Sequence, residues 1–213
     1  MKPVIQKSML VLSLAAAAAG IGGCVPLPLL LGGGAMAGGV MVASDRRTSG
    51  TVLEDNTIQI KASNRISENL GERVHINVTS YNRQLLLTGE VPSEQDKQLA
   101  EKVVAGVENV RAVVNELAVL GNSTLTQRSS DALVTSRVKA NLVDAKDLLS
   151  NAFKVTTERG TVYLMGRVTK RESNRATEVI TGTTGVQRLV RMLEIISEDE
   201  LANMSPPPAD TKK

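Results

Sequence analysis

The stretch that decides the fold is residues 78–89, VTSYNRQLLLTG, which returns 77 residues later in residues 155–166 as VTTERGTVYLMG. Both copies read as a strand, a polar turn and a second strand with alternating apolar residues. Asn82 and Arg83 occupy the turn of the first copy, which predicts a β-hairpin, and Arg159 and Gly160 do so in the second. Side chains alternate across a strand, so one inward face should carry Leu85, Leu87, Val162 and Leu164.

Helical patterns flank both hairpins in the same order. Upstream, apolar residues recur at helical spacing, at Ile58, Ala62, Ile66 and Leu70, then at Val134, Val138 and Leu142. Downstream, the pairs Ser93 with Asp96 and Thr169 with Glu172 have the spacing of a helix-capping box. Each second helix should end in a left-handed cap, at Gly106 and Gly182, before a Val-rich last strand. The predicted fold class is therefore α+β, with two tandem α-β-β-α-β domains, each a three-stranded mixed sheet covered by two helices.

The first residues predict export. Lys2 and Lys7 precede an apolar run over residues 9–19, and the small residues Gly22 and Gly23 stand directly before Cys24. A basic start, a short apolar core and a small-residue cleavage site are typical of a secretory signal peptide. Two alternatives stay open: a secreted protein with an incidental Cys24, and an uncleaved anchor that continues through residues 25–43.

The single cysteine bears on this choice. One cysteine cannot form an intramolecular disulfide, and an odd cysteine in an exported protein needs an explanation. The segment ending in Cys24 resembles a bacterial lipobox, which implies a covalent diacylglycerol and an N-acyl chain on Cys24 and no other cofactor. Two or more acyl chains give stable anchoring. Because residue 25 is valine, whereas the inner-membrane retention signal of enteric lipoproteins is an aspartate, the resemblance implies the periplasmic face of the outer membrane.

Composition and spacing divide the chain into five predicted parts. These are a signal peptide (residues 1–23), a lipidated Gly-rich tether (24–55), a first domain (56–121), a second domain (129–198) and a disordered tail (199–213). Tyr81, Phe153 and Tyr163 are the only aromatic residues. Base stacking needs aromatic faces, so we expect no nucleic-acid partner.

Together these features resemble the BON-domain family. The order of helix, hairpin, Gly-x-Val, second helix and Val-rich strand matches the BON pattern, and residues 45–51, DRRTSGT, together with residues 154–160, KVTTERG, are similar to dual-BON lipoproteins of Gram-negative bacteria. The resemblance implies binding of anionic phospholipid, a role in envelope integrity and proximity to outer-membrane assembly or cell-division proteins. It implies no enzymatic activity.

No catalytic constellation is visible in the sequence. His75 is the sole histidine, and a metal site needs several clustered ligands, so we expect no metal site. Glu68 and Glu72 lie one helical turn apart, but Arg65 and Arg73 nearby favour a solvated helix face. We therefore predict a binding module and not an enzyme.

Charge separates the two domains. Residues 57–120 hold seven Lys or Arg and eight Asp or Glu, a net charge of −1, whereas residues 128–198 hold twelve and eight, a net charge of +4. Basic residues near an anionic membrane contribute on the order of 1 kcal/mol each. Drift of surface charge is the alternative interpretation.

The second domain also has a longer loop before its first strand. Thirteen positions separate Leu142 from Val155, against eight between Leu70 and Val78. Apolar residues beside lysines can enter a headgroup layer, although they could also close the end of the sheet. The family resemblance adds the opening helix of the second domain, so the lipid-binding candidates are Leu133, Arg137, Lys139, Lys146, Leu148 and Leu149.

The sequence thus predicts a periplasmic lipoprotein of the outer membrane that binds anionic phospholipid through its second domain. A protein–protein adaptor for envelope assembly or division machinery is the alternative. A cell-wall or lipid hydrolase is the least favoured interpretation.

Overall fold

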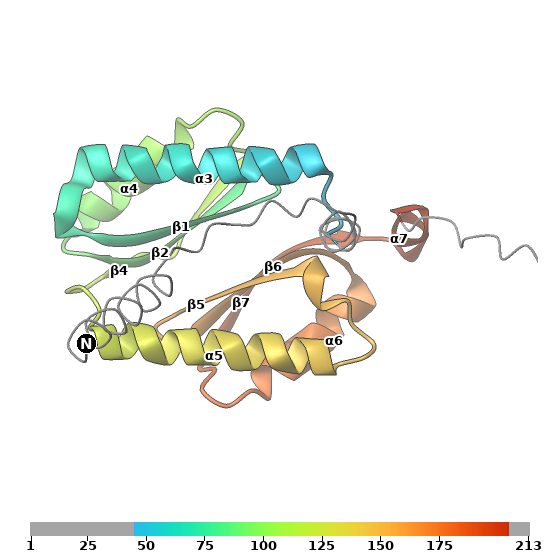
Figure 1. Ribbon diagram of the computed structural model, residues 1–213. Coiled ribbons are helices and arrows are strands. Elements are labelled where there is room, and N and C mark those ends of the chain that lie inside the picture. Colours follow the sequence, from blue (N-terminus) through green and yellow to red (C-terminus); the bar gives the residue numbers. More distant parts are fainter. Residues whose placement is uncertain (1–44, 205–213) are drawn as a thin grey trace, which may run out of the picture. The chain divides into compact units, whose positions relative to one another are not determined.

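The computed structural model describes residues 45–204, all of which belong to one compact unit, residues 40–213. The predicted signal peptide, Cys24, most of the tether and the last nine residues lie outside the described part. Within it the chain forms two successive α+β domains, which confirms the predicted fold class (Figure 1).

The first domain opens with a long helix and closes with two short strands. Its elements are α3 (Ser49–Leu70), η1 (Gly71–Arg73), β1 (His75–Tyr81), β2 (Gln84–Val91), α4 (Glu94–Ala105), β3 (Ala112–Asn115) and β4 (Ala118–Val119). Helices α3 and α4 cover one face of its sheet (Figure 1).

The second domain repeats this order with an unbroken last strand. Its elements are α5 (Leu125–Asp144), η2 (Ser150–Ala152), β5 (Phe153–Glu158), β6 (Thr161–Thr169), α6 (Lys170–Thr181), β7 (Arg188–Ile196) and the short α7 (Glu198–Met204). Asn115 explains the break in the first domain, because its side-chain Oδ1 accepts a hydrogen bond from the backbone of Leu117 at 3.2 Å. Arg191 takes the equivalent place in β7 and lets the strand run on.

Both sheets are mixed, as predicted. The hairpin strands pair antiparallel, β1 with β2 and β5 with β6, and the last strand returns across a helix to pair parallel with the second. The predicted turns are confirmed, since Asn82 and Arg83 have φ of 48° and 64°, and Arg159 and Gly160 have φ of 52° and 69°. Positive φ at both central residues is the signature of a type I′ turn.

The predicted left-handed caps at Gly106 and Gly182 are wrong. Both glycines keep φ near −80°, and the left-handed residues come three positions later, at Asn109 and Gly185. The reason is that each helix unwinds through two consecutive tight turns. In the first domain these are closed by hydrogen bonds from Val107 N to Val104 O (3.0 Å) and from Val110 N to Val107 O (3.3 Å).

Helical structure extends beyond the predicted domain limits at both ends. Helix α3 begins at Ser49, inside the predicted tether, because the Thr48 side chain caps it by accepting a hydrogen bond from Thr51 N at 3.1 Å. Residues 198–204, most of them assigned to the predicted tail, form helix α7.

Three apolar clusters hold the fold together. One lies between sheet and helices in each domain and contains the predicted inward residues Leu85, Leu87, Val162 and Leu164. The third joins the helix-free faces of the two sheets, and its buried members are Tyr81, Leu86, Tyr163 and Met165. Each sheet is therefore buried on both faces, and the two domains share the third cluster.

Candidate functional site

The outer face of α5 carries the predicted lipid-binding residues of the helix. Leu133 is 58% exposed, and Arg137 and Lys139 are also exposed. The opposite face of α5 supplies Val134, Val138 and Leu142 to the core of the second domain. Substitutions on the outer face therefore change side chains that do not belong to the core.

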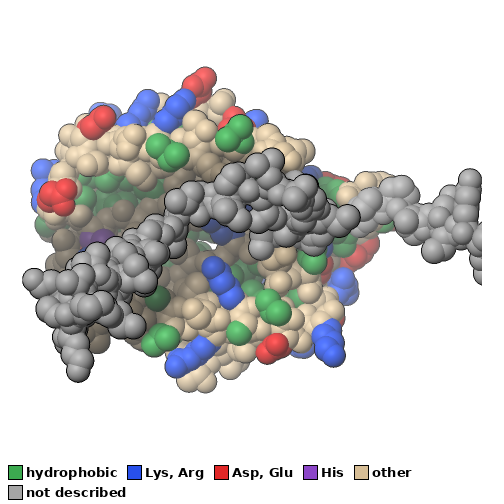
Figure 2. Space-filling model, viewed as in Figure 1, with side chains coloured by type: hydrophobic (Ala, Val, Ile, Leu, Met, Phe, Trp, Pro, Cys, Tyr) green, Lys and Arg blue, Asp and Glu red, His purple; other side chains and the backbone are tan. Residues whose placement is uncertain are grey.

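The same face holds residues that the sequence reasoning did not single out. Leu125 is 80% exposed and Val143 is 64% exposed, and the 18 positions from one to the other make about five turns, so both point the same way. Leu133 lies about 80° further round the helix, on the same exposed side. Arg128 is exposed one turn after Leu125, and its Nε donates to Ser123 Oγ at 3.1 Å. Figure 2 shows apolar and basic side chains exposed on the domain to which α5 belongs.

Charge distinguishes α5 from its counterpart α3. Setting aside the buried Asp131, α5 has three basic residues (Arg128, Arg137, Lys139) against one acid, Asp144. Helix α3 also exposes large apolar side chains, Leu53 at 68% and Ile60 at 62%. Setting aside the buried Asp55, however, its two bases are balanced by two acids. The net charge is thus +2 on α5 and zero on α3.

The loop before β5 exposes two of its three predicted lipid-binding residues. Lys146 is exposed and Leu149 is 41% exposed, but Leu148 is half-buried and packs against the core of the second domain. Leu148 therefore closes the end of the sheet, whereas Lys146 and Leu149 remain available at the surface.

Arg46 and Arg47 clasp the two domains where the chain enters them. Arg46 makes a two-pronged ion pair with Glu172 at the start of α6, with both N–O distances 2.7 Å, and donates to Arg167 O at 3.0 Å. Arg47 pairs with Asp55 of α3 at 2.7 Å and lies over the Tyr81 ring, 4.1 Å from its centroid. Adjacent residues thus hold opposite domains.

Burial alone would raise the pKa of Glu172, but hydrogen bonds from Arg46 and from the Thr169 backbone outweigh it and hold that pKa below its usual value. The Glu172 carboxylate is therefore charged in the folded protein at neutral pH.

A buried aspartate in each opening helix holds the hairpin turn. Asp131 accepts from Arg159 N at 2.7 Å and from Gly160 N at 2.8 Å. Asp55 accepts in the same way from the backbone of the first turn, at Asn82 and Arg83. A signal was present in the sequence, because each aspartate falls on the apolar stripe of its helix.

His75, Glu90 and Glu158 come together between the two domains. His75 Nδ1 lies 2.9 Å from Glu90 Oε2, and Glu158 from β5 of the second domain accepts from Asn77 Nδ2 at 2.9 Å. A nitrogen of His75 and one oxygen of each glutamate lie within 4.8 Å of one another.

The two carboxylates of this cluster differ in pKa. Burial would raise the pKa of Glu90, but hydrogen bonds from His75 and Ser123 hold it below its usual value. Burial raises the pKa of Glu158, the Asn77 hydrogen bond opposes this effect, and nearby Glu90 adds to it.

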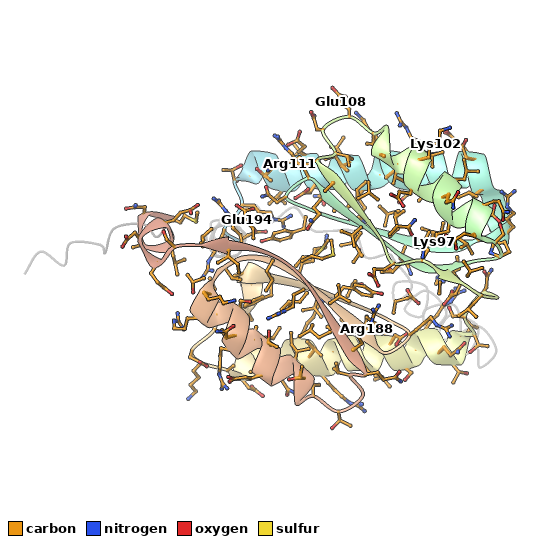
Figure 3. All side chains as sticks on the ribbon, turned by 180° about the vertical axis from the view of Figure 1, so that it is seen from behind. Lys97, Lys102, Glu108, Arg111, Arg188 and Glu194 are labelled. Atoms are coloured by element: carbon orange, nitrogen blue, oxygen red, sulfur yellow. The ribbon has the colours of Figure 1, made fainter. Side chains whose placement is uncertain are left out.

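A groove of about 620 Å³ runs between the last strands of the two domains. It is lined by β3 and β7, and each of these pairs with only one neighbour among the described strands. Figure 3 shows this side of the molecule, with Arg111 and Glu194 on opposite domains. Arg188, on β7, forms an ion pair across the domains with Glu116 at 2.6 Å.

No helix within residues 45–204 is both long and apolar enough to cross a bilayer.

Comparison with known proteins gives one family and several relatives. The family described as BON domain matches residues 54–121 and again residues 130–197. The chain is 33% identical over 176 residues to the outer membrane lipoprotein DolP of Haemophilus influenzae, covering 82% of this chain and 89% of that protein. It is 28% identical to a 21 kDa hemolysin of Actinobacillus pleuropneumoniae (71% and 79% covered) and 29% identical to the osmotically-inducible protein Y of Escherichia coli (70% and 76% covered). None of these names indicates a catalytic family.

Proposed function

Because this chain belongs to the BON-domain family and carries two copies of that domain, we propose that it is an outer-membrane lipoprotein which binds anionic phospholipid through the outer face of α5. The observation that carries the proposal is the exposed stripe of Leu125, Leu133 and Val143 beside three basic residues. Apolar side chains that enter a headgroup layer between cations are the pattern of an interfacial helix.

Lipidation of Cys24 supplies the anchor in this proposal. The relative named as an outer membrane lipoprotein and the sequence around Cys24 support it. Asp45 follows Cys24 by 21 positions, and such a length spans at most about 75 Å when extended, which sets the farthest that Asp45 can lie from the anchored cysteine. Cys24→Ala should release the protein from the outer-membrane fraction, and unchanged fractionation would contradict the anchor.

We assign the protein a binding role and not a catalytic one. The names of its relatives and the matched family support this assignment. Turnover of phospholipid or cell wall by the purified chain, lost on changing one carboxylate, would contradict it.

The test of lipid binding uses the chain from Asp45 onward and vesicles with or without anionic lipid. Both domains are kept, because either half alone would expose the shared core around Leu86 and Met165. We expect sedimentation with anionic vesicles only, and binding should weaken as salt rises, since charge attraction is screened beyond roughly 8 Å at physiological ionic strength.

Two variants separate the charged and apolar contributions. At roughly 1 kcal/mol per basic residue, reversing Arg137 and Lys139 together to glutamate should weaken binding tenfold or more. Leu133→Ala should remove part of the binding that persists at high salt. Neither variant should change the unfolding temperature, because all three side chains are exposed.

The matched controls lie on α3. Lys61→Glu and Leu53→Ala alter exposed residues of the corresponding helix and should leave vesicle binding unchanged. Binding to neutral vesicles as strong as to anionic ones, or an equal loss in the α3 variants, would refute the assignment to α5.

A protein-binding adaptor is the second candidate function, and the groove between β3 and β7 favours it. An open strand edge offers unpaired backbone groups to an extended peptide. Crosslinking in cells from a photoreactive residue placed at Arg111 should then capture an envelope protein, while the same residue at Glu68 should not. Identical capture patterns at both positions would contradict this role.

A further inference from the structure

We infer that His75, Glu90 and Glu158 form a binding site for a divalent transition metal ion such as Zn²⁺, which joins the first domain to the second. Among the described residues they are the one group of three potential ligands whose donor atoms lie within 4.8 Å. This inference departs from the sequence-based expectation of no metal site, because Glu90 and Glu158 approach His75 only through folding and domain packing.

The donor set selects the class of metal. One imidazole nitrogen and two carboxylate oxygens suit Zn²⁺ and its transition-metal neighbours, whereas Mg²⁺ and Ca²⁺ prefer oxygen ligands alone. Two strands of the first domain and one of the second supply the ligands. His75 faces Glu90 directly across the β1–β2 ladder, and Glu158 is the last residue of β5.

A buried carboxylate oxygen of Glu90 provides an independent observation, because it accepts no hydrogen bond. The Glu90 side chain is completely buried, and the oxygen without a hydrogen bond is Oε1. Arg159 Nη1 approaches this oxygen no closer than 3.5 Å, while Oε2 is occupied by Ser123 N at 3.1 Å and by His75. The long ion pair with Arg159 offsets only part of the cost of burying this oxygen without a hydrogen bond, and a metal ion bound at Oε1 would offset more of it.

Glu158 adds a second carboxylate that burial disfavours in its charged form. It lines a cavity of about 260 Å³ together with His75, Asn77 and Asp131. Two negative groups that face one another in a partly closed space repel each other, and a divalent cation between them converts the repulsion into attraction.

Two nearby cations limit the affinity. Arg159 lies beside Glu90, and Arg128 lines the same cavity. Asp131 is engaged by the backbone of the β5–β6 turn and does not offset them fully. We therefore expect weaker metal binding than the same three ligands would give without neighbouring cations.

The experiment titrates ZnCl₂ into the metal-free full chain without a histidine tag, with Cys24→Ser so that the only thiol cannot bind the ion. Calorimetry should give one Zn²⁺ per chain, and MgCl₂ at the same concentration should give none. Because His75 is the only histidine of the chain, its ring nitrogens can be observed by NMR without ambiguity, and they should shift with saturation at one equivalent.

Glu158→Gln and His75→Gln should each weaken Zn²⁺ binding at least tenfold. Glu158→Gln folds readily, because it replaces a buried carboxylate by a neutral group of the same shape. Glu68→Gln, on the exposed face of α3, is the matched control and should bind like the parent. Absence of stoichiometric binding, equal binding by Glu158→Gln and the parent, or an equal response to Mg²⁺ would overturn the inference.

Discussion

Removing the Arg46 side chain should test how much the clasp contributes to stability. The Arg46 and Glu172 side chains are 7% and 4% exposed, so the pair is almost fully removed from water. Breaking a buried pair by deleting one partner costs about 3–5 kcal/mol, because the other charge stays buried. Glu172 retains the hydrogen bond from Thr169 N at 2.9 Å, which places Arg46→Ala near the lower end, at about 3 kcal/mol.

The assay is urea unfolding followed by circular dichroism, with thermal unfolding alongside. For a protein of this size a loss of 3 kcal/mol lowers the unfolding temperature by about 6–12 °C. Lys61→Ala is the matched control. It removes an ion pair with Glu108 in which the side chains are 51% and 74% exposed, and exposed pairs contribute about 0–1 kcal/mol.

The double variant Arg46→Ala with Glu172→Gln tests whether the unpaired charge of Glu172 causes the loss of stability. If the cost arises from the buried unpaired carboxylate, neutralising it should recover part of the lost free energy of unfolding. Surface substitutions usually change the free energy of unfolding by less than about 0.5 kcal/mol. A change for Arg46→Ala within this range would refute a stabilising role of the Arg46–Glu172 pair. A double variant no more stable than the single one would refute the role assigned to charge.

Three further predictions concern other parts of the fold. Gly89→Ala should lower the free energy of unfolding by at least about 2 kcal/mol, because Gly89 has φ of 115° and an added Cβ would lie 2.0 Å from a backbone oxygen; Gly121→Ala, in open space, is its control. Asp131→Asn should cost about 1–3 kcal/mol in urea unfolding, since an amide leaves one of the two turn N–H groups without an acceptor. Because the pKa of Glu172 is lowered in the folded state, its contribution is complete above the ordinary glutamate pKa of about 4.3 and is lost as pH falls through the lower folded value. The acid limb of the stability profile should therefore be shallower in Glu172→Gln than in the parent, and superimposable profiles would contradict the assignment.

Local sequence patterns predict most of each domain, because local interactions decide it. The type I′ turns follow from the pairs Asn82–Arg83 and Arg159–Gly160 between alternating strands. The helix faces follow from apolar spacing such as that of Val134, Val138 and Leu142. The helix ends were harder to predict. A glycine after a helix can close it in more than one way, and here two consecutive tight turns delay the left-handed residue by three positions.

The contact between the two sheets was missed although the sequence held a signal for it. The runs Leu85–Leu86–Leu87 and Val162–Tyr163–Leu164–Met165 are apolar at every position, which is typical of a strand buried on both faces. Reading only alternate residues assigned one face to the core and left Leu86 and Met165 without a role.

The candidate sites also differ in how far local sequence predicts them. The exposure of Leu133, Arg137 and Lys139 follows from the periodicity of one helix, which also makes Leu125 and Val143 outward-facing in retrospect. The cluster of His75, Glu90 and Glu158 could not be read from spacing, because its members are brought together by strand pairing and by docking of the second domain. The ion pair of Arg46 could not be predicted from local sequence, because its partner Glu172 lies 126 residues away.

The position of the clasp has a mechanical consequence. The chain continues from Arg47 directly into the first domain. By covalent connectivity alone, the second domain would be linked to the N-terminal segment only through the first domain. Arg46 changes this arrangement by pairing with Glu172, so a force applied to the chain on the N-terminal side of Arg46 would be divided between the two domains. If the proposed anchor at Cys24 holds, the point where both domains are attached to it is a pair of adjacent residues, and separating the domains would first require breaking one of these two ion pairs.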